Sequence, residues 1–302
     1  MKKVKHIYLN YSTYDQYYKC KRKFQYHSLH HLVSTRASHA DLDPSCEAFF
    51  KGQLVHNSLD AWNQGKEWEP VFDAMIKPHY AINSLKDTQS GSIKHMKDLI
   101  RAYFKHYNNE RRQIVFSERK LMMPLNDKVT LVGTLDEAMM RGDKIILVDH
   151  KTSSSLSQFM EPTMHVSDQF TMYIMLAQAA GIDTDTLMIN GISTGKAALD
   201  RFETDDPDHR LFMRYETSRT RDQIDEFREM IEFESRRMIE DIENETFTKT
   251  PDKGTCVAFH KKCPYLYVCG KDAAVRSKLL ASDFKHTTTE LDNLSFKVEY
   301  EE

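Results

Sequence analysis

The spacing of apolar residues in the first third of the chain is that of amphipathic helices. It predicts one helix through the tyrosine-rich segment Tyr14 to Tyr26, with Ser12 as its N-cap. A second helix is expected from about Cys46 to Trp62, and a third over roughly Ile93 to Tyr107. The N-terminal region is therefore expected to be largely helical.

The period of the pattern changes near residue 114. Ile114 to Leu125 and Val129 to Met139 have the alternation of strands and flank the turn Asn126-Asp127. Lys144 to His150 predicts a further strand. Three strands that follow one another with short turns predict a meander.

Helical spacing returns in Val166 to Ala180, where Gly181 is expected to end the helix, and Leu187 to Ile192 predicts another strand. From Ser218 to Glu245 a long amphipathic helix is expected, because its apolar residues recur three, four and seven positions apart amid charged ones. The last thirty or so residues have little pattern and stay unassigned. Strands mixed with helices predict an α/β fold with a central mixed sheet flanked by helices.

Composition limits the classes of function. The chain has 302 residues, of which 40% are hydrophobic and 11% aromatic, enough for a substantial core in one large or two small domains. The net charge of -3 excludes a protein that coats polyanions generally, so any nucleic-acid site must be a local basic patch. Lys19, Lys21, Arg22 and Lys23 offer such a patch, although a solvated basic stretch of helix explains them equally well.

The N-terminus lacks the apolar run of a signal peptide, and no segment approaches the roughly 20 apolar residues that cross a bilayer. We therefore expect a cytoplasmic protein without a membrane partner, in a prokaryotic or phage-infected cell. In that reducing compartment five cysteines favour metal binding over disulfides.

The segment from Asp136 to Lys151 carries the strongest chemical signal. If Gly142 and Asp143 form a two-residue type II' hairpin loop, Arg141 pairs with Lys144 and, counting outward, Asp136 faces Asp149. Residues opposite each other on antiparallel strands have Cβ atoms about 5 Å apart, so the two carboxylates would repel each other. A divalent cation would relieve this repulsion.

Lys151 follows Asp149 by two residues and is expected on the same strand face. Mg2+ or Mn2+ suits two hard oxygen ligands and can stabilise the charge of phosphodiester attack, with Lys151 orienting or helping to deprotonate the attacking water. The side chain of His150 should point to the other face, so its contribution to the metal would be its backbone carbonyl. Alternatively, Asp136 and Asp149 lie on a solvated face with Lys151 as a salt-bridge partner.

Gly133-x-x-Asp136 followed by Asp149-x-Lys151-Thr152 resembles the core of the RecB-like branch of the PD-(D/E)XK nuclease superfamily. In that branch the two aspartates are metal ligands and the lysine is catalytic. Leu135 stands where the motif name has proline, a substitution that the branch commonly tolerates. The resemblance implies a restriction-endonuclease-like core.

Three further segments match the family in order and approximate spacing. Gly52-Gln53-Leu54-Val55-His56 is similar to its Gly-x-x-x-His motif, which implies that His56 is a metal ligand. Gln169 and Tyr173 match its Gln-x-x-x-Tyr motif and share a helix face, from which they could contact DNA or order the site. Glu118 matches an acidic position upstream of Gly-x-x-Asp, although taken singly it would more often be a surface glutamate.

The cysteine pattern resembles the cluster-bearing members of this branch, such as AddB-type nuclease domains and CRISPR-adaptation exonucleases, with one early and three late cysteines. It implies a 4Fe-4S cluster held by Cys20, Cys256, Cys263 and Cys269. The late spacing departs from the family, because His260 stands three residues before Cys263. His260 as fourth ligand, or a tetrahedral Zn2+, remain alternatives, and Cys46 is expected to be a buried thiol.

The resemblance runs from residue 12 to about 270. It implies a single nuclease domain over residues 1–270 with cluster-binding ends, followed by an unassigned extension over 271–302. The implied activity is divalent-metal-dependent hydrolysis of DNA, most of all as an exonuclease on single-stranded ends. The alternatives are a non-catalytic DNA-binding or assembly subunit of a recombination or repair complex, and a structure-specific or RNA endonuclease. No Gly-x4-Gly-Lys-Ser/Thr motif occurs, so any helicase would be a separate partner.

Overall fold

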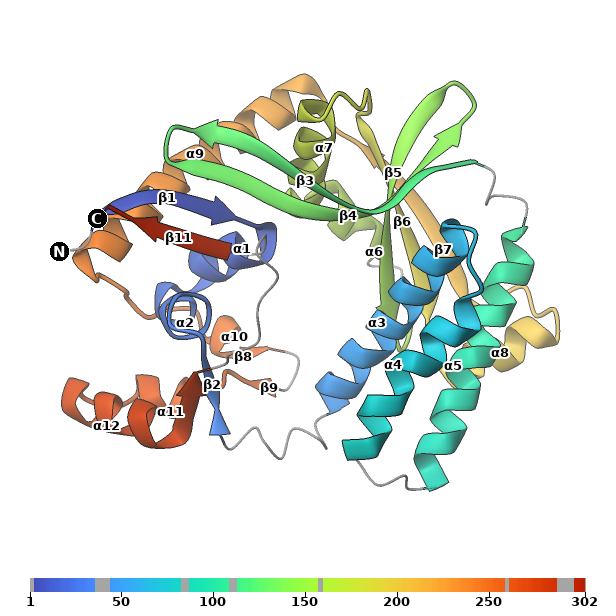
Figure 1. The fold of residues 1–302 in the computed structure, drawn as a ribbon, viewed down its shortest axis with the longest axis horizontal. Coiled ribbons are helices and arrows are strands. Elements are labelled where there is room, and N and C mark those ends of the chain that lie inside the picture. The colour runs from blue at the N-terminus through green and yellow to red at the C-terminus, as the bar shows by residue number, and fades with distance from the viewer. Residues whose placement is uncertain are drawn as a thin grey trace. The chain divides into compact units, whose positions relative to one another are not determined.

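A computed structural model describes residues 3–35, 44–82, 87–108, 113–156, 160–258, 261–286 and 296–301. The chain divides into two compact units. Unit 1 comprises Met1–Ala40, Met122–Gly133 and Asp222–Glu302, and unit 2 comprises Asp41–Leu121 and Thr134–Arg221. Strands paired both parallel and antiparallel, with helices around them, confirm the predicted α/β fold with a mixed sheet (Figure 1).

The strands of unit 2 carry the segment from Asp136 to Lys151. They are parts of β3 (Ile114–Asn126) and β4 (Val129–Arg141), and all of β5 (Lys144–Ser153), β6 (Thr186–Ser193) and β7 (Phe212–Ser218). The β4–β5 and β6–β7 pairs are antiparallel, whereas β5 and β6 are parallel. Nearly every residue of β6 is buried, as expected for a strand covered on both faces.

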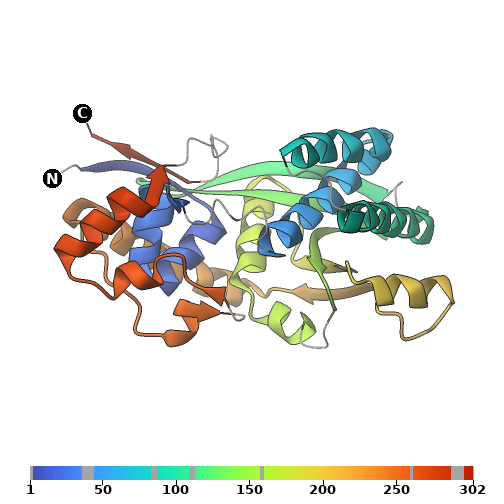
Figure 2. The same ribbon diagram turned by 90° about the horizontal axis from the view of Figure 1, so that it is seen from below.

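Helices cover these strands. They are α3 (Pro44–Asn63), α4 (Trp68–Ile82), α5 (Asp87–His106), α6 (Met160–His165), α7 (Asp168–Ala179) and α8 (Lys196–Glu203). The first three lie side by side in both views (Figures 1 and 2) and share an apolar cluster that includes Leu54, Phe72 and Leu99. Helix α3 also contacts β5, and α7 contacts β6.

Unit 1 brings together the two ends of the chain. Strand β1 (Val4–Leu9) pairs in parallel with β4 and antiparallel with β11 (Phe296–Tyr300), as Figure 1 shows. Its helices are α1 (Tyr11–Lys19), α2 (Lys21–Phe24), the π-helix η1 (Gln25–Leu29), α9 (Arg221–Asn244), α10 (Lys253–Cys256), α11 (Leu266–Cys269) and α12 (Ala273–Asp283). Two short antiparallel pairs complete it, β2 (Leu32–Ser34) with β10 (Phe284–His286) and β8 (Val257–Ala258) with β9 (Lys261–Lys262).

The prediction of one continuous N-terminal helix capped by Ser12 is wrong. Asn10 is the cap, because its side-chain oxygen accepts a hydrogen bond from the Thr13 N–H at 2.8 Å, and Ser12 itself donates to Asn10. The helix ends at Cys20, whose backbone is extended with φ of -162° and ψ of 101°. Tertiary contacts that a local pattern does not encode, such as the Arg22 N–H bonding to Thr248 O at 3.0 Å, accompany this break.

The other predicted helices and strands are confirmed, with ends that agree within three residues except at α5, which begins at Asp87 rather than near Ile93. The elements that the pattern did not predict are β1, β2, α4, α6, α8, β7 and all those that follow α9. Strand β11 lies in the region left unassigned. Its apolar residues Phe296, Val298 and Tyr300 alternate with charged ones, but the strand is only five residues long and the segment around it is polar, so the pattern is weak. No helix in the described ranges is both long and apolar enough to span a bilayer.

Candidate active site

The hairpin of β4 and β5 has the predicted register. Arg141 pairs with Lys144, and the pairing continues to Glu137 opposite Val148. Gly142 has a φ of 62°, a conformation that favours glycine and that the first central residue of a type II' turn requires. Asp136 and Asp149 are the next residues on the two strands, so the register brings them to the same face.

The carboxylates of Asp136 and Asp149 are both largely shielded from solvent. Asp149 is 2% exposed, and its carboxylate is paired with the ammonium of Lys151, whose Nζ lies 2.9 Å from Oδ2. Asp136 Oδ2 accepts a hydrogen bond from the His150 main-chain N–H at 2.7 Å. Burial, together with the charge of Asp149, raises the pKa of Asp136 to about 6. Two buried carboxylates that disfavour joint ionisation fit a divalent cation.

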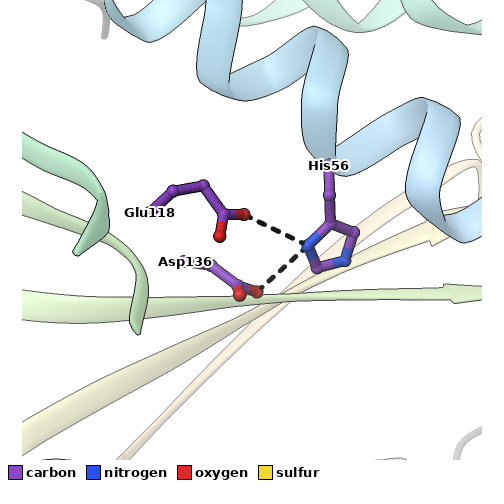
Figure 3. Close-up of side chains that lie close together, drawn as sticks. All are labelled: His56, Glu118 and Asp136. Carbon is purple, nitrogen blue, oxygen red and sulfur yellow. Dashed lines mark ion pairs between the residues drawn. The ribbon is translucent and has the colours of Figure 1, made fainter. Parts of the chain in front are cut away.

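His56 on α3 and Glu118 on β3 complete a group of three possible ligands with Asp136. His56 Nδ1 lies 3.7 Å from Glu118 Oε1 and 3.6 Å from Asp136 Oδ2 (Figure 3). One ligand atom from each of the three lies within 4.8 Å of the others. Glu118 was singled out in the sequence only by resemblance, and the fold brings it to His56.

The hydrogen bonds of His56 determine which of its ring nitrogens faces the carboxylates. Nε2 lies 3.0 Å from the His150 main-chain oxygen, which can only accept, so Nε2 carries the proton. In the neutral ring, Nδ1 then directs a lone pair toward two carboxylates, an arrangement that a cation or a second proton would relieve. Burial lowers the pKa of His56, but Glu118 and Asp136 outweigh it, and the net shift is upward.

Lys151 joins these acidic groups to α7. Its Nζ lies 2.9 Å from Asp149 Oδ2 and donates to Oδ1 at 3.2 Å and to Gln169 Oε1 at 3.4 Å. Gln169 in turn donates to the Tyr173 hydroxyl at 3.0 Å, one helical turn away. Burial lowers the pKa of Lys151, yet Asp149 more than offsets it, so the ammonium form is favoured.

His150 points its side chain to the opposite face of β5, as predicted. Its Nδ1 lies 2.9 Å from Asn190 Nδ2, and its Nε2 lies 3.4 Å from Glu137 Oε2. Asn190 also contacts the Tyr103 hydroxyl at 2.7 Å, and Arg214 donates to Asn190 Oδ1 at 3.1 Å. Sequence spacing gave no sign of this buried polar network. The main chain of His150 faces Asp136 and His56: its N–H donates to Asp136, and its carbonyl oxygen accepts the His56 hydrogen bond.

The candidate metal ligands line one pocket of about 690 Å3 together with Lys151, Gln169 and Tyr173. One face of α3 lines it with Phe49, Gln53, His56 and Asp60, in addition to Gly52. A Cβ atom at Gly52 would lie 3.1 Å from Thr152 Oγ1, closer than most such contacts. Glycine in the Gly-x-x-x-His segment therefore allows α3 to approach β5.

The four cysteines named for a cluster lie together in unit 1. Cys20, Cys256, Cys263 and Cys269 line the same small pocket and are free thiols, with Cys20 buried. The Cys263 N–H donates to Cys256 O at 2.8 Å, and burial raises the pKa of the Cys263 and Cys269 thiols. His260 and the side chain of Cys46 lie outside the described residues.

Comparison with known proteins identifies the family. The family model described as the PD-(D/E)XK nuclease superfamily matches residues 8–270. No curated protein matches the chain. Among solved structures, a candidate exonuclease from Eubacterium rectale is 13% identical with a TM-score of 0.44, covering 79% of this chain and 82% of that one.

The structure of SSO0001 is 17% identical with a TM-score of 0.27, covering 61% of this chain and 73% of that one. Neither structural likeness adds to the assignment, because both TM-scores are below 0.5. The family match is sufficient, since it spans far more than half of the chain and contains every residue of both candidate sites. The chain belongs to the PD-(D/E)XK nuclease superfamily.

Proposed function

We propose that this protein hydrolyses phosphodiester bonds of DNA with Mg2+ or Mn2+, acting on single-stranded ends. The observation that carries the proposal is the convergence of His56, Glu118 and Asp136 beside the buried Asp149 and the ammonium of Lys151. A solvated strand face, the alternative for Asp136 and Asp149, does not fit Asp149, which is only 2% exposed.

The residues that would hold the cation are His56, Glu118, Asp136 and Asp149, and the His150 carbonyl would supply a further oxygen ligand. A divalent cation bound there would supply stabilisation of the negative charge that develops during phosphodiester hydrolysis. The donor set of carboxylates and one imidazole suits Mg2+ or Mn2+.

Lys151 is the residue we assign to the attacking water. Asp149 and Gln169 fix its Nζ by hydrogen bonds of 3.2 and 3.4 Å, and they leave a third ammonium proton for a water or a phosphate oxygen. In this role Lys151 orients the water and offsets charge on the phosphate. Tyr173 holds Gln169, because its hydroxyl accepts the Gln169 amide proton.

The test compares hydrolysis of end-labelled single-stranded DNA, circular single-stranded DNA and RNA by wild type, Asp149→Ala and Lys151→Ala. Proteins purified without oxygen are assayed with Mg2+, Mn2+ or a chelator. We expect metal-dependent cutting of the linear DNA by wild type and a loss of about 100-fold or more in both variants. Asp143→Ala, at the exposed tip of the same hairpin, is the matched control and should cut normally.

Cutting by both variants at the wild-type rate would reject the site. A wild type that binds DNA but cuts none of the three substrates would favour the non-catalytic subunit. Equal cutting of circular DNA or of RNA would instead favour an endonuclease.

We also propose that Cys20, Cys256, Cys263 and Cys269 hold a 4Fe-4S cluster, with tetrahedral Zn2+ as the alternative. Four free thiols that line one pocket supply the number of ligands that either group needs. Lys23 lines the same pocket, and although burial raises the pKa of the Cys269 thiol, the charge of Arg22 and its hydrogen bond offset part of that rise. Both cations favour thiolates there. The group would join segments from the two ends of the sequence.

A further inference from the structure

An exposed aromatic ring stands on the helix face that lines the candidate active site. Phe49 is 69% exposed and lines the same pocket as His56, Asp149 and Lys151. It precedes His56 by seven residues on α3, which places it two helical turns away, about 10 Å along the axis. The ring therefore lies within the reach of a nucleotide or two from the candidate metal ligands.

The core of unit 2 does not account for the ring of Phe49. Its neighbour Phe50 packs against the apolar cluster of α3, α4 and α5, whereas Phe49 is turned toward the pocket and solvent. Around it the same face of α3 presents polar side chains, among them Gln53 and Asn57. A large apolar ring beside polar groups in a phosphodiester-hydrolysing pocket has the chemistry of a stacking platform for a nucleobase.

We propose that Phe49 stacks on an unpaired base next to the reacting phosphate, so that the pocket selects single-stranded or frayed ends. The inference rests on the proposed function and names the part of the substrate that the pocket recognises. Every base has a π-face, so the contact would be tolerant of sequence. Bases inside a duplex already stack on both faces and cannot offer one to Phe49, which makes the selection one of strandedness.

The test is a cycle that varies enzyme and substrate together. Wild type, Phe49→Ala, Phe49→Leu and Phe49→Trp are assayed on single-stranded oligonucleotides that carry one abasic site, moved in turn through three positions on either side of a cleaved bond. We expect Phe49→Ala and Phe49→Leu to lose about 5- to 100-fold in kcat/KM on the intact strand, and Phe49→Trp to retain most of it.

Wild type should lose a similar factor on one abasic oligonucleotide, and Phe49→Ala should lose almost nothing more on it. Phe233→Ala is the matched control, because Phe233 is also exposed, at 57%, but does not line the pocket. Equal kcat/KM for wild type and Phe49→Leu on the intact strand, or additive losses from Phe49→Ala and the abasic site, would overturn the proposal.

A binding measurement separates this proposal from the proposed function. Fluorescence anisotropy with the same oligonucleotides is recorded with Ca2+ in place of Mg2+, since Ca2+ also prefers oxygen ligands. If wild type cuts nothing but its affinity for the intact strand depends on Phe49, the stacking contact stands and the hydrolytic function fails. If cutting occurs and neither affinity nor kcat/KM depends on Phe49 or on the base, the hydrolytic function stands and the stacking contact fails.

Discussion

The main-chain N–H of His150 donates a hydrogen bond to Asp136 Oδ2 over 2.7 Å, so the residue between Asp149 and Lys151 holds a carboxylate of the neighbouring strand. The carbonyl oxygen of the same residue accepts a hydrogen bond from His56 Nε2. One backbone position therefore fixes candidate ligands from β4 and from α3. Side chains that hold His150 in place therefore also fix the positions of these ligands. Hydrogen bonds from residues that do not touch the metal commonly orient metal ligands in this way.

Asn190 is the residue that we expect to immobilise His150 from the other face of the sheet. It is fully buried and contacts His150 Nδ1, the Tyr103 hydroxyl and the guanidinium of Arg214. Asn190→Ala removes the buried hydrogen bonds of this amide to His150, Tyr103 and Arg214, which should lower the free energy of unfolding by about 2–4 kcal/mol in urea titrations. The exposed Asn108→Ala should change it by less than about 0.5 kcal/mol. A loss below about 1 kcal/mol for Asn190→Ala would contradict this role.

Asp136 should destabilise the metal-free protein at neutral pH. Its pKa is raised from 3.8 to about 6, so between these values the folded state binds a proton more tightly than the unfolded state. The contribution of Asp136 to stability is therefore greatest below about pH 4 and falls as pH rises through 6. Asp136→Asn removes the carboxylate charge and keeps an oxygen for the His150 N–H.

We expect Asp136→Asn to raise the free energy of unfolding by about 1–3 kcal/mol at pH 7.5 in a chelator, with the gain shrinking toward zero near pH 4. Thermal unfolding of both proteins from pH 4 to 8 measures the difference. Added Mn2+ should reverse the order, because the cation stabilises wild type more than the variant. If the variant is less stable than wild type at pH 7.5 without metal, the negative charge of Asp136 is already balanced by groups of the protein, and the prediction is wrong.

The sequence predicted the geometry of the hairpin but not the groups around it, for a physical reason. A two-residue loop at Gly142-Asp143 determines the register of the strands, so the approach of Asp136 and Asp149 follows by counting. By contrast, the contact of His56 with the His150 carbonyl depends on how closely α3 packs on β5, and no spacing along the chain encodes that distance. Resemblance identified His56 and Glu118, whereas neither pattern nor resemblance pointed to Asn190.

Metal-dependent hydrolysis should depend on Gly52, because this glycine allows α3 to approach β5 closely. An alanine Cβ at this position would lie 3.1 Å from Thr152 Oγ1, so the helix or the threonine must shift by a few tenths of an ångström. Helix propensity favours alanine by about 1 kcal/mol, which should keep Tm near that of wild type. The displacement of His56 should nevertheless lower metal-dependent hydrolysis by about 3- to 10-fold.

A second substitution tests whether the contact with Thr152 causes that loss. Thr152→Ala removes the atom that the new Cβ would meet, so Gly52→Ala with Thr152→Ala should cut faster than Gly52→Ala alone. Thr152→Ala by itself is the control for any direct role of the hydroxyl in the pocket. If the double variant is no faster than Gly52→Ala, crowding at this contact is not what limits the single variant.

The cysteine pocket predicts which thiols the protein needs to retain a metal. Cys20 is on the N-terminal segment, and the other three thiols are near the C-terminus, so a bound cluster would connect the two. Because a cubane cluster takes four thiolates, Cys20→Ala should release most of the iron and lower thermal stability. Iron, inorganic sulfide and zinc measured on anaerobically purified protein distinguish the 4Fe-4S cluster from Zn2+.

Cys46→Ala is the control, because no cluster motif surrounds Cys46 in the sequence and it stands outside the four proposed ligands. It should leave the metal content unchanged. We expect Cys20→Ala and Cys46→Ala to differ in metal content because of the backbone at Cys20. This residue is extended and ends α1, and its thiol lies among the late cysteines rather than on a continuous helix. Full iron and sulfide content in Cys20→Ala would exclude Cys20 as a ligand, and zinc without sulfide in wild type would replace the cluster with a tetrahedral zinc site.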